Sequence, residues 1–157
     1  MLIYLYWAGL VLSGSCLIYQ DFKTRLISTW LIILFTLSNV SLYLSGNSFQ
    51  KFFENCIFCL SYFLFCYLIL HLYFYLKTKT FQKILDSKVG WGDVLLFIAV
   101  GCTLTPEILI YFFTATFFVS VIGHFFVFKA NKNVPLAGYL IIMFLTYMLL
   151  DTLDLLV

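Results

Sequence analysis

The sequence has little charge, little proline and no long polar segment. Charged residues make up 10% of its 157 residues and two residues are proline, whereas 64% are hydrophobic. A water-soluble domain of this size needs a polar exterior, so the low charge excludes one. The net charge of +2 is too small and too scattered to indicate nucleic-acid binding. We therefore expect an all-α, multi-pass membrane protein in which residues 1–157 form a single membrane-embedded domain.

The cysteines lack the spacing of a metal or redox site. All five lie in apolar segments, where a thiol behaves as a small hydrophobic group. Cys56 and Cys59 form a C-x-x-C pair, but no second pair completes a zinc site and no strand precedes it as in a thioredoxin-like motif. We therefore expect packing roles for the cysteines, and neither a metal nor a cofactor.

Apolar runs of bilayer length predict about six transmembrane helices. A crossing needs about 20 apolar residues. The stretch 94–128 would rise roughly 50 Å as one helix, well beyond a hydrocarbon core of about 30 Å, so it must hold two. Thr105 and Pro106 supply the start signal for the second of them. The expected helices span 2–19, 26–45, 52–76, 93–104, 106–128 and 134–157. The basic loop before the fourth is either solvated or a short interfacial helix around 81–85.

The basic residues favour one orientation of these helices. Eight of the nine Lys and Arg residues fall in the connections after the first, third and fifth expected helices, and only Lys51 falls on the other side. Basic connections stay in the cytoplasm, so both termini are predicted to be non-cytoplasmic. The fourth helix is short for a crossing. Either its outer end stops in a protein-lined turn below the surface, or its inner end is recessed.

Two aspartates are predicted at the cytoplasmic end of the bundle. Asp21 lies in the polar segment 20–25 after the first helix, and Asp93 begins the fourth helix after a Gly-Trp-Gly sequence whose glycines would let the backbone turn closely. An acid at the mouth of a membrane helix is costly and marks a functional site by default. Two neighbouring carboxylates share one proton, so that one acts on water as base and the other as acid. The pair predicts aspartic protease chemistry.

These motifs resemble those of the type IV prepilin peptidases, which are membrane-embedded aspartic proteases of the GxGD type. Asp21, followed by Lys23 and Arg25, is similar to the first catalytic aspartate of that family and its basic residues. Pro135 lies in a segment that resembles the start of the family's last helix, and Gly138 stands where a second proline is frequent. The GxGD motif itself is matched by Gly90, Trp91, Gly92 and Asp93.

The resemblance implies an endopeptidase that removes the short basic leader of type IV prepilin-like proteins at the cytoplasmic face of the bacterial inner membrane. Asp21 and Asp93 would be the catalytic residues. The implied partners are prepilin or pseudopilin substrates, in type IV pilus assembly or protein secretion, and the lipid bilayer. Larger members carry a methyltransferase domain after the first helix, for which this chain has no room, so we expect peptidase activity without methylation. The supporting residues would be Gly90, Trp91, Gly92, Lys23, Arg25 and Pro135.

Simpler interpretations of the acids stay open at this stage. Asp93 alone could be a helix N-cap, and Asp21 could pair with a neighbouring basic side chain. Asp151 and Asp154 form another acidic pair, predicted at the opposite membrane face and without assigned chemistry. For the whole protein, the alternatives are a lipoprotein signal peptidase-like aspartic protease and a non-enzymatic membrane transport or assembly subunit whose acids bind a cation or a proton.

The two histidines are predicted near the same membrane face as the aspartates. His71 lies near the end of the third expected helix and His124 near the end of the fifth. Either could reach the site, but a neutral, hydrogen-bonded histidine is the simpler interpretation.

Overall fold

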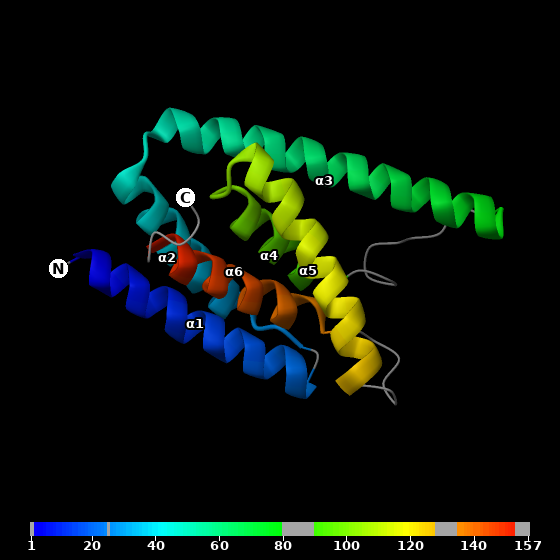
Figure 1. Ribbon diagram of the computed structural model, residues 1–157, viewed down its shortest axis with the longest axis horizontal. Coiled ribbons are helices and arrows are strands. Elements are labelled where there is room, and N and C mark those ends of the chain that lie inside the picture. The colour runs from blue at the N-terminus through cyan, green and yellow to red at the C-terminus, as the bar shows by residue number, and fades with distance from the viewer. Residues whose placement is uncertain (1, 25, 80–89, 128–134, 153–157) are drawn as a thin grey trace.

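The described part of the chain is entirely helical. The computed structural model describes residues 2–24, 26–79, 90–127 and 135–152, and no strand occurs among them. Consecutive helices run in opposite directions, so the ends of α1, α3 and α5 lie toward the same side as the starts of α2, α4 and α6 (Figure 1). The helices are α1 (Leu2–Thr24), α2 (Thr29–Gly46), α3 (Phe49–Thr78), α4 (Trp91–Gly101), α5 (Pro106–Val127) and α6 (Leu136–Thr152).

The lengths and surface of these helices confirm an all-α multi-pass membrane protein. α1, α2, α3 and α5 are long and apolar enough to cross a bilayer, whereas α4 and α6, with 11 and 17 residues, are shorter apolar helices. Large apolar side chains face outward, as Trp30 on α2 and Tyr111 on α5 do at 80% and 77% exposure. Such a surface is stable in lipid and not in water.

The largest difference from the predicted helix limits is at the end of α1. The helix continues to Thr24 through most of the segment 20–25, which was expected to be a polar connection. The reason is a buried stripe at helical spacing that runs through Leu10, Gly14 and Leu17 and ends at Asp21. Asp21 is therefore a helical residue that faces the other helices.

The remaining helix limits differ from the prediction by a turn or less. α2 and α3 begin at Thr29 and Phe49 instead of at 26 and 52, and α4 covers Trp91–Gly101 instead of 93–104. The expected start at Pro106 is confirmed, and the Thr105 carbonyl accepts the first hydrogen bond of α5 from the Leu109 N–H at 2.8 Å. The suggested interfacial helix around 81–85 lies outside the described residues, as do 128, 134 and 153–157 of the last two predicted helices.

Small residues let α1 approach its neighbours. A Cβ added at Gly14 would lie 3.2 Å from the Ile141 side chain on α6 and 3.5 Å from the Phe35 ring on α2. Small residues at such crossings let membrane helices pack closely, because lipid provides no hydrophobic driving force for their association.

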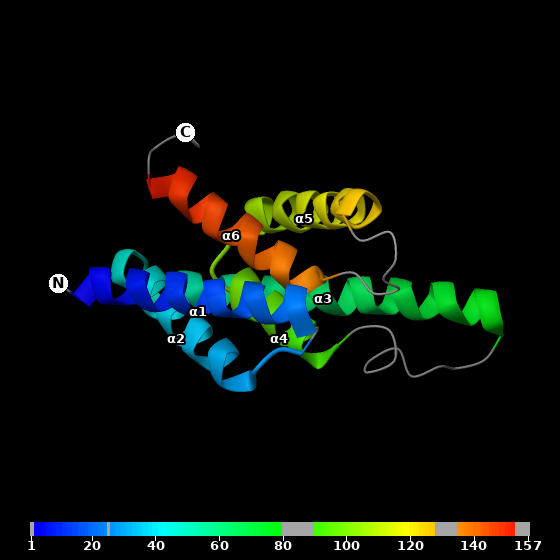
Figure 2. The same ribbon diagram turned by 90° about the horizontal axis from the view of Figure 1, so that it is seen from below.

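α5 lies on one side of the bundle and α2 and α4 lie on the other (Figure 2).

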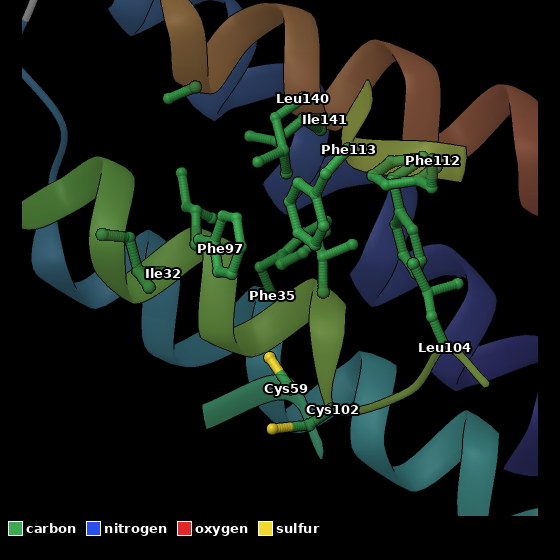
Figure 3. Packing of buried hydrophobic residues seen from close by; sticks show 14 of the residues in the cluster. Ile32, Phe35, Cys59, Phe97, Cys102, Leu104, Phe112, Phe113, Leu140 and Ile141 are labelled. Carbon is green, nitrogen blue, oxygen red and sulfur yellow. The ribbon is translucent and has the colours of Figure 1, made fainter. Parts of the chain in front are cut away.

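The middle of the bundle is filled by what we call the aromatic layer, which joins α3, α4, α5 and α6. The rings of Phe97 and Phe113 stack with centroids 3.7 Å apart, Phe112 meets Phe144 edge to face at 6.2 Å, and Tyr62 stacks on Phe97 at 6.3 Å. Figure 3 shows Phe97, Phe112 and Phe113 converging with aliphatic side chains of α6. The four phenylalanines are nearly fully buried.

The short helix α4 stops inside the protein. The buried side chain of Asn39 on α2 donates to the Ala99 carbonyl and to the Thr103 hydroxyl, both at 3.0 Å. Leu104, in the turn to α5, is 2% exposed. The structure therefore supports the first alternative for the short helix, a protein-lined turn, at the end of α4 away from Asp93, which we call the outer end of α4. The Ala99 carbonyl, which lipid could not satisfy, is thus bonded by a neighbouring helix.

Candidate active site

Asp21 lies near the end of α1, and its side chain faces α6. Its side chain is 5% exposed, and its Oδ2 atom accepts a hydrogen bond of 2.7 Å from the Gly138 N–H. The nearby Lys23 Nζ instead donates to the Tyr19 hydroxyl at 2.6 Å and lies 4.9 Å from the centre of that ring. In the structure Lys23 is therefore an exposed side chain that is bonded to a tyrosine. Arg25 lies outside the described residues.

Asp93 is the third residue of α4 and is half-buried. Gly90, not Asp93, occupies the N-cap position, which corrects the simple N-cap interpretation. The Asp93 carboxylate lies within electrostatic range of Asp21, and the backbone N–H groups of Gly90 and Ala137 are directed at it. Reaching back from the third helical position to the N-cap N–H is the geometry of a capping box. The structure therefore brings Asp21 and Asp93 together at one end of the bundle.

The glycines of the Gly-Trp-Gly-Asp sequence act through size rather than through unusual backbone angles. Gly90 has φ −71° and ψ 145°, which any residue adopts, so the expected dependence on a special turn is wrong for this position. A Cβ added at Gly92 would lie 3.3 Å from the Ile27 side chain, in the connection between α1 and α2. Gly92 thus permits α4 to approach that connection. Trp91 is 55% exposed at the mouth of α4.

The third element of the site is the first turn of α6. Pro135 precedes the helix, and its carbonyl accepts a hydrogen bond from the Tyr139 N–H at 3.3 Å. This first turn carries the Ala137 and Gly138 N–H groups that face the two carboxylates. The Phe22 ring covers this turn and meets the Tyr139 ring edge to face, with centroids 5.3 Å apart. Pro135 therefore begins a helix whose amino-terminal groups point into the acidic pair.

The other polar residues singled out from the sequence lie elsewhere or outside the described region. The His71 ring packs on the Tyr67 ring of α3, with centroids 5.6 Å apart. The His124 side chain and Asp154 lie outside what the structure describes, and Asp151 is exposed near the far end of α6. No group of three or more His, Cys, Asp or Glu residues that could hold a metal ion occurs in the described part.

The cysteines of the C-x-x-C pair lie on α3, next to the outer end of α4. Cys59 is buried, Cys56 is partly buried, and Cys102 caps α4 beside them. All five cysteines are free thiols. Figure 3 shows Cys59 and Cys102 at the edge of the apolar cluster.

Sequence reasoning missed three contributors to the site. Gln20 accepts the Ser28 N–H through its Oε1 atom at 3.0 Å and thereby ties the end of α1 to the start of α2. Phe22 packs on Tyr139 beside the first turn of α6, and Gly138 donates to Asp21. The available signal for Gly138 was its place in the first turn after a proline, where backbone N–H groups have no partner within their own helix. The other two required knowing that α1 continues past Tyr19.

The arrangement is suited to proton transfer. Two carboxylates within electrostatic range repel each other when both are ionised, so the pair keeps one proton at a lower cost. A pair that holds one proton can accept a proton from water and donate one to a leaving group in the same turnover. Because Asp93 is only half-buried, the pair is within reach of water from its own end of the bundle.

The sequence matches a known family over most of its length. The family model described as the type IV leader peptidase family matches residues 7–127, which include most of α1, all of α2 to α5 and both aspartates. Neither the curated proteins nor the solved structures contain a significant match to the chain. Pro135 and α6 follow the matched region. Since the match covers well over half of the chain, this multi-pass membrane protein belongs to the type IV leader peptidase family.

Proposed function

We propose that this peptidase is a prepilin-type aspartic endopeptidase in which Asp21 and Asp93 activate water. Membership of the type IV leader peptidase family makes it a hydrolase that cuts peptide bonds. The observation that carries the proposal is the meeting of the two carboxylates, which are far apart in sequence, at one end of the bundle. The family match favours this function over a lipoprotein signal peptidase and over a transport or assembly subunit.

The proposed reaction uses the pair in its singly protonated form. The ionised carboxylate takes a proton from a water molecule, whose oxygen bonds to the carbonyl carbon of the substrate peptide. The protonated carboxyl group then donates its proton to the amide nitrogen as the C–N bond breaks. The products are a new carboxyl group and a new amine, and the pair again holds one proton. This general acid–base sequence requires no metal ion and no covalent intermediate.

The substrate follows from the site's position. A prepilin-like protein would keep its short basic leader in the cytoplasm and its apolar stem in the bilayer, which places the cleaved bond at the membrane interface. The negative charge of the acidic pair attracts a basic leader. Trp91, exposed beside Asp93, is the kind of side chain that anchors at this depth. Lys23, held by Tyr19 at the end of α1, marks the same interface.

We further propose the bacterial inner membrane as the location and residues 1–157 as a single membrane domain, with six crossings and both termini non-cytoplasmic. The antiparallel order of the six helices agrees with this arrangement, since it puts Lys23 and Lys77 toward one side and Lys51 toward the other. Prepilin or pseudopilin proteins and the lipid bilayer are the proposed partners.

The test is co-expression of the full chain with type IV leader-bearing proteins encoded in the same genome, with leader removal scored by mass. We expect the wild-type chain to remove the leader and Asp21→Asn and Asp93→Asn each to leave it in place. Membrane insertion of each variant, followed by fractionation, is the control. Processing by either variant at a near wild-type rate would contradict the proposed dyad.

A further inference from the structure

The first turn of α6 has no cap of its own. A helix leaves its first N–H groups without partners inside the helix, and a side-chain oxygen of the N-cap residue usually accepts one of them. Pro135, the residue before α6, has no side-chain oxygen. Ala137 and Gly138 are buried or nearly so, and buried N–H groups need acceptors. The acceptors must therefore come from other helices.

The acidic pair supplies these acceptors. Asp21 of α1 accepts the Gly138 N–H at 2.7 Å, and the Asp93 side chain of α4 faces the Ala137 N–H. Two consecutive N–H groups of one helical turn thus face one carboxylate each, and the Gly138 N–H is bonded to Asp21. The amino-terminal end of a helix carries a partial positive charge, so it also offsets the negative charge that the pair carries.

The close approach of Asp21 to α6 requires glycine at position 138. A Cβ added there would lie 2.5 Å and 2.8 Å from two ring carbons of Phe22, and 3.3 Å from Asp21 Oδ2. The Phe22 ring is itself held against Tyr139. A larger residue would therefore displace the ring and lengthen the bond between α6 and Asp21.

We propose that Gly138 is a positioning residue of the reaction: its N–H group, with that of Ala137, fixes the two carboxylates relative to each other on the first turn of α6. The inference rests on the proposed Asp21 and Asp93 pair. A proline at position 138 would have no N–H group and could not make the bond to Asp21. The chain therefore holds its first aspartate through a contact that depends on this glycine.

The experiment compares Gly138→Pro, which removes the N–H group, with Gly138→Ala, which keeps it and adds a Cβ. The kcat and KM of the full chain in membranes are measured on a type IV leader-bearing protein from the same genome. A hydrogen bond to a charged group contributes about 1.5 to 3 kcal/mol, so we expect Gly138→Pro to lower kcat roughly 10- to 100-fold. KM should stay within about twofold, because the bond joins two parts of the enzyme and its loss acts on the reaction step.

A second pair of variants separates crowding from bond loss. Gly138→Ala alone should lower kcat by displacing Phe22, and the double variant Phe22→Leu with Gly138→Ala should recover most of the loss, because the leucine makes room for the methyl group. The matched control is Gly46→Ala, where an added Cβ meets nothing within 4 Å, and it should change neither constant. The thermal midpoint of each variant in detergent shows whether it is folded.

The outcomes are distinct. If Asp21→Asn is inactive while Gly138→Pro keeps the wild-type kcat, positioning by Gly138 is wrong and the dyad stands. If Asp21→Asn remains active, the proposed function is wrong. If Gly138→Pro does not fold, the Phe22→Leu rescue decides: recovery of kcat supports positioning, and a double variant as slow as Gly138→Ala overturns it.

Discussion

The two ends of the bundle each bury polar side chains, but they do so with different chemistry. At the outer end, Asn39 donates its neutral amide to the carbonyl end of α4. At the other end, Asp21 accepts the N–H of the first turn of α6. Both side chains satisfy the end of a helix that belongs to another part of the chain. A neutral amide can stabilise without reacting, whereas a carboxylate beside a second carboxylate can also exchange a proton.

The largest expected effect is on the cleavage rate, which should fall for a substitution at Asp21 and not for one at Asn39. Asp21→Asn removes an ionisable group and should lower the cleavage rate by roughly 10³-fold or more, the scale of a lost acid–base group. Asn39→Asp, the reverse exchange at the outer end, should leave the dyad and its kcat within a few-fold of wild type in whatever fraction remains folded. Rates normalised to folded protein by size-exclusion chromatography check this. Equal losses of normalised rate would remove the distinction between the two ends.

The next effect tests packing at the outer end. A Cβ added at Gly101 would collide with the Cys59 sulfur and lie 3.4 Å from Leu109 Cδ1. Gly101→Val should therefore lower the free energy of unfolding by about 1 to 3 kcal/mol, the cost of overpacking a filled core. Thermal unfolding in detergent measures the change. Gly46→Ala is the control, and an unchanged midpoint for Gly101→Val would show that α3 moves aside at no cost.

A smaller loss is expected from the outer cap itself. Asn39→Leu removes the bonds to the Ala99 carbonyl and the Thr103 hydroxyl, and we expect a loss of about 1 to 2 kcal/mol in the free energy of unfolding. The cleavage rate of the folded protein should stay the same. Ser45→Ala, at an exposed hydroxyl that bonds only within its own helix, is the control and should change the unfolding midpoint little.

The smallest expected change in stability comes from a substitution at Gln20, next to the acidic pair. Gln20→Ala frees the Ser28 N–H at the start of α2 and should cost about 1 kcal/mol or less, because that N–H is partly accessible to other acceptors. Because Gln20 is the residue before Asp21 and ties the end of α1 to the start of α2, Gln20→Ala should also lower kcat modestly. Gln50→Ala, whose amide contacts Glu54 on the surface of α3, should change neither quantity. A stability loss as large as that of Asn39→Leu would contradict this order.

The sequence was informative about elements and less so about their ends. Apolar run lengths predicted six helices correctly, because bilayer thickness sets that length. They placed Asp21 in a loop, because polar residues at 20–25 interrupt the hydropathy. The spacing of Leu10, Gly14 and Leu17, extended by one turn, reaches Asp21 and would have kept it in the helix. Hydropathy averages over a window, whereas burial follows one face of the helix.

The side chains of the candidate site could be predicted from the sequence, whereas its backbone N–H groups could not. Both aspartates were identified from their type and place in the sequence. The contribution of Ala137 and Gly138 comes from N–H groups that every residue except proline carries, so no residue type announces it. Only the tertiary arrangement shows that the turn after Pro135 faces the carboxylates. The roles of the two acids remain predictions that the variants above test.

The aromatic layer bears on how far water can enter the bundle from the acidic pair. Phe97 lies one helical turn, or roughly 6 Å, beyond Asp93, and it stacks on Phe113 without room for a water molecule. Under the proposed function, water that enters at the acidic pair would meet these stacked rings before it could reach the opposite end of the bundle. The aromatic layer would thereby confine the wet part of the site to one end of the helices.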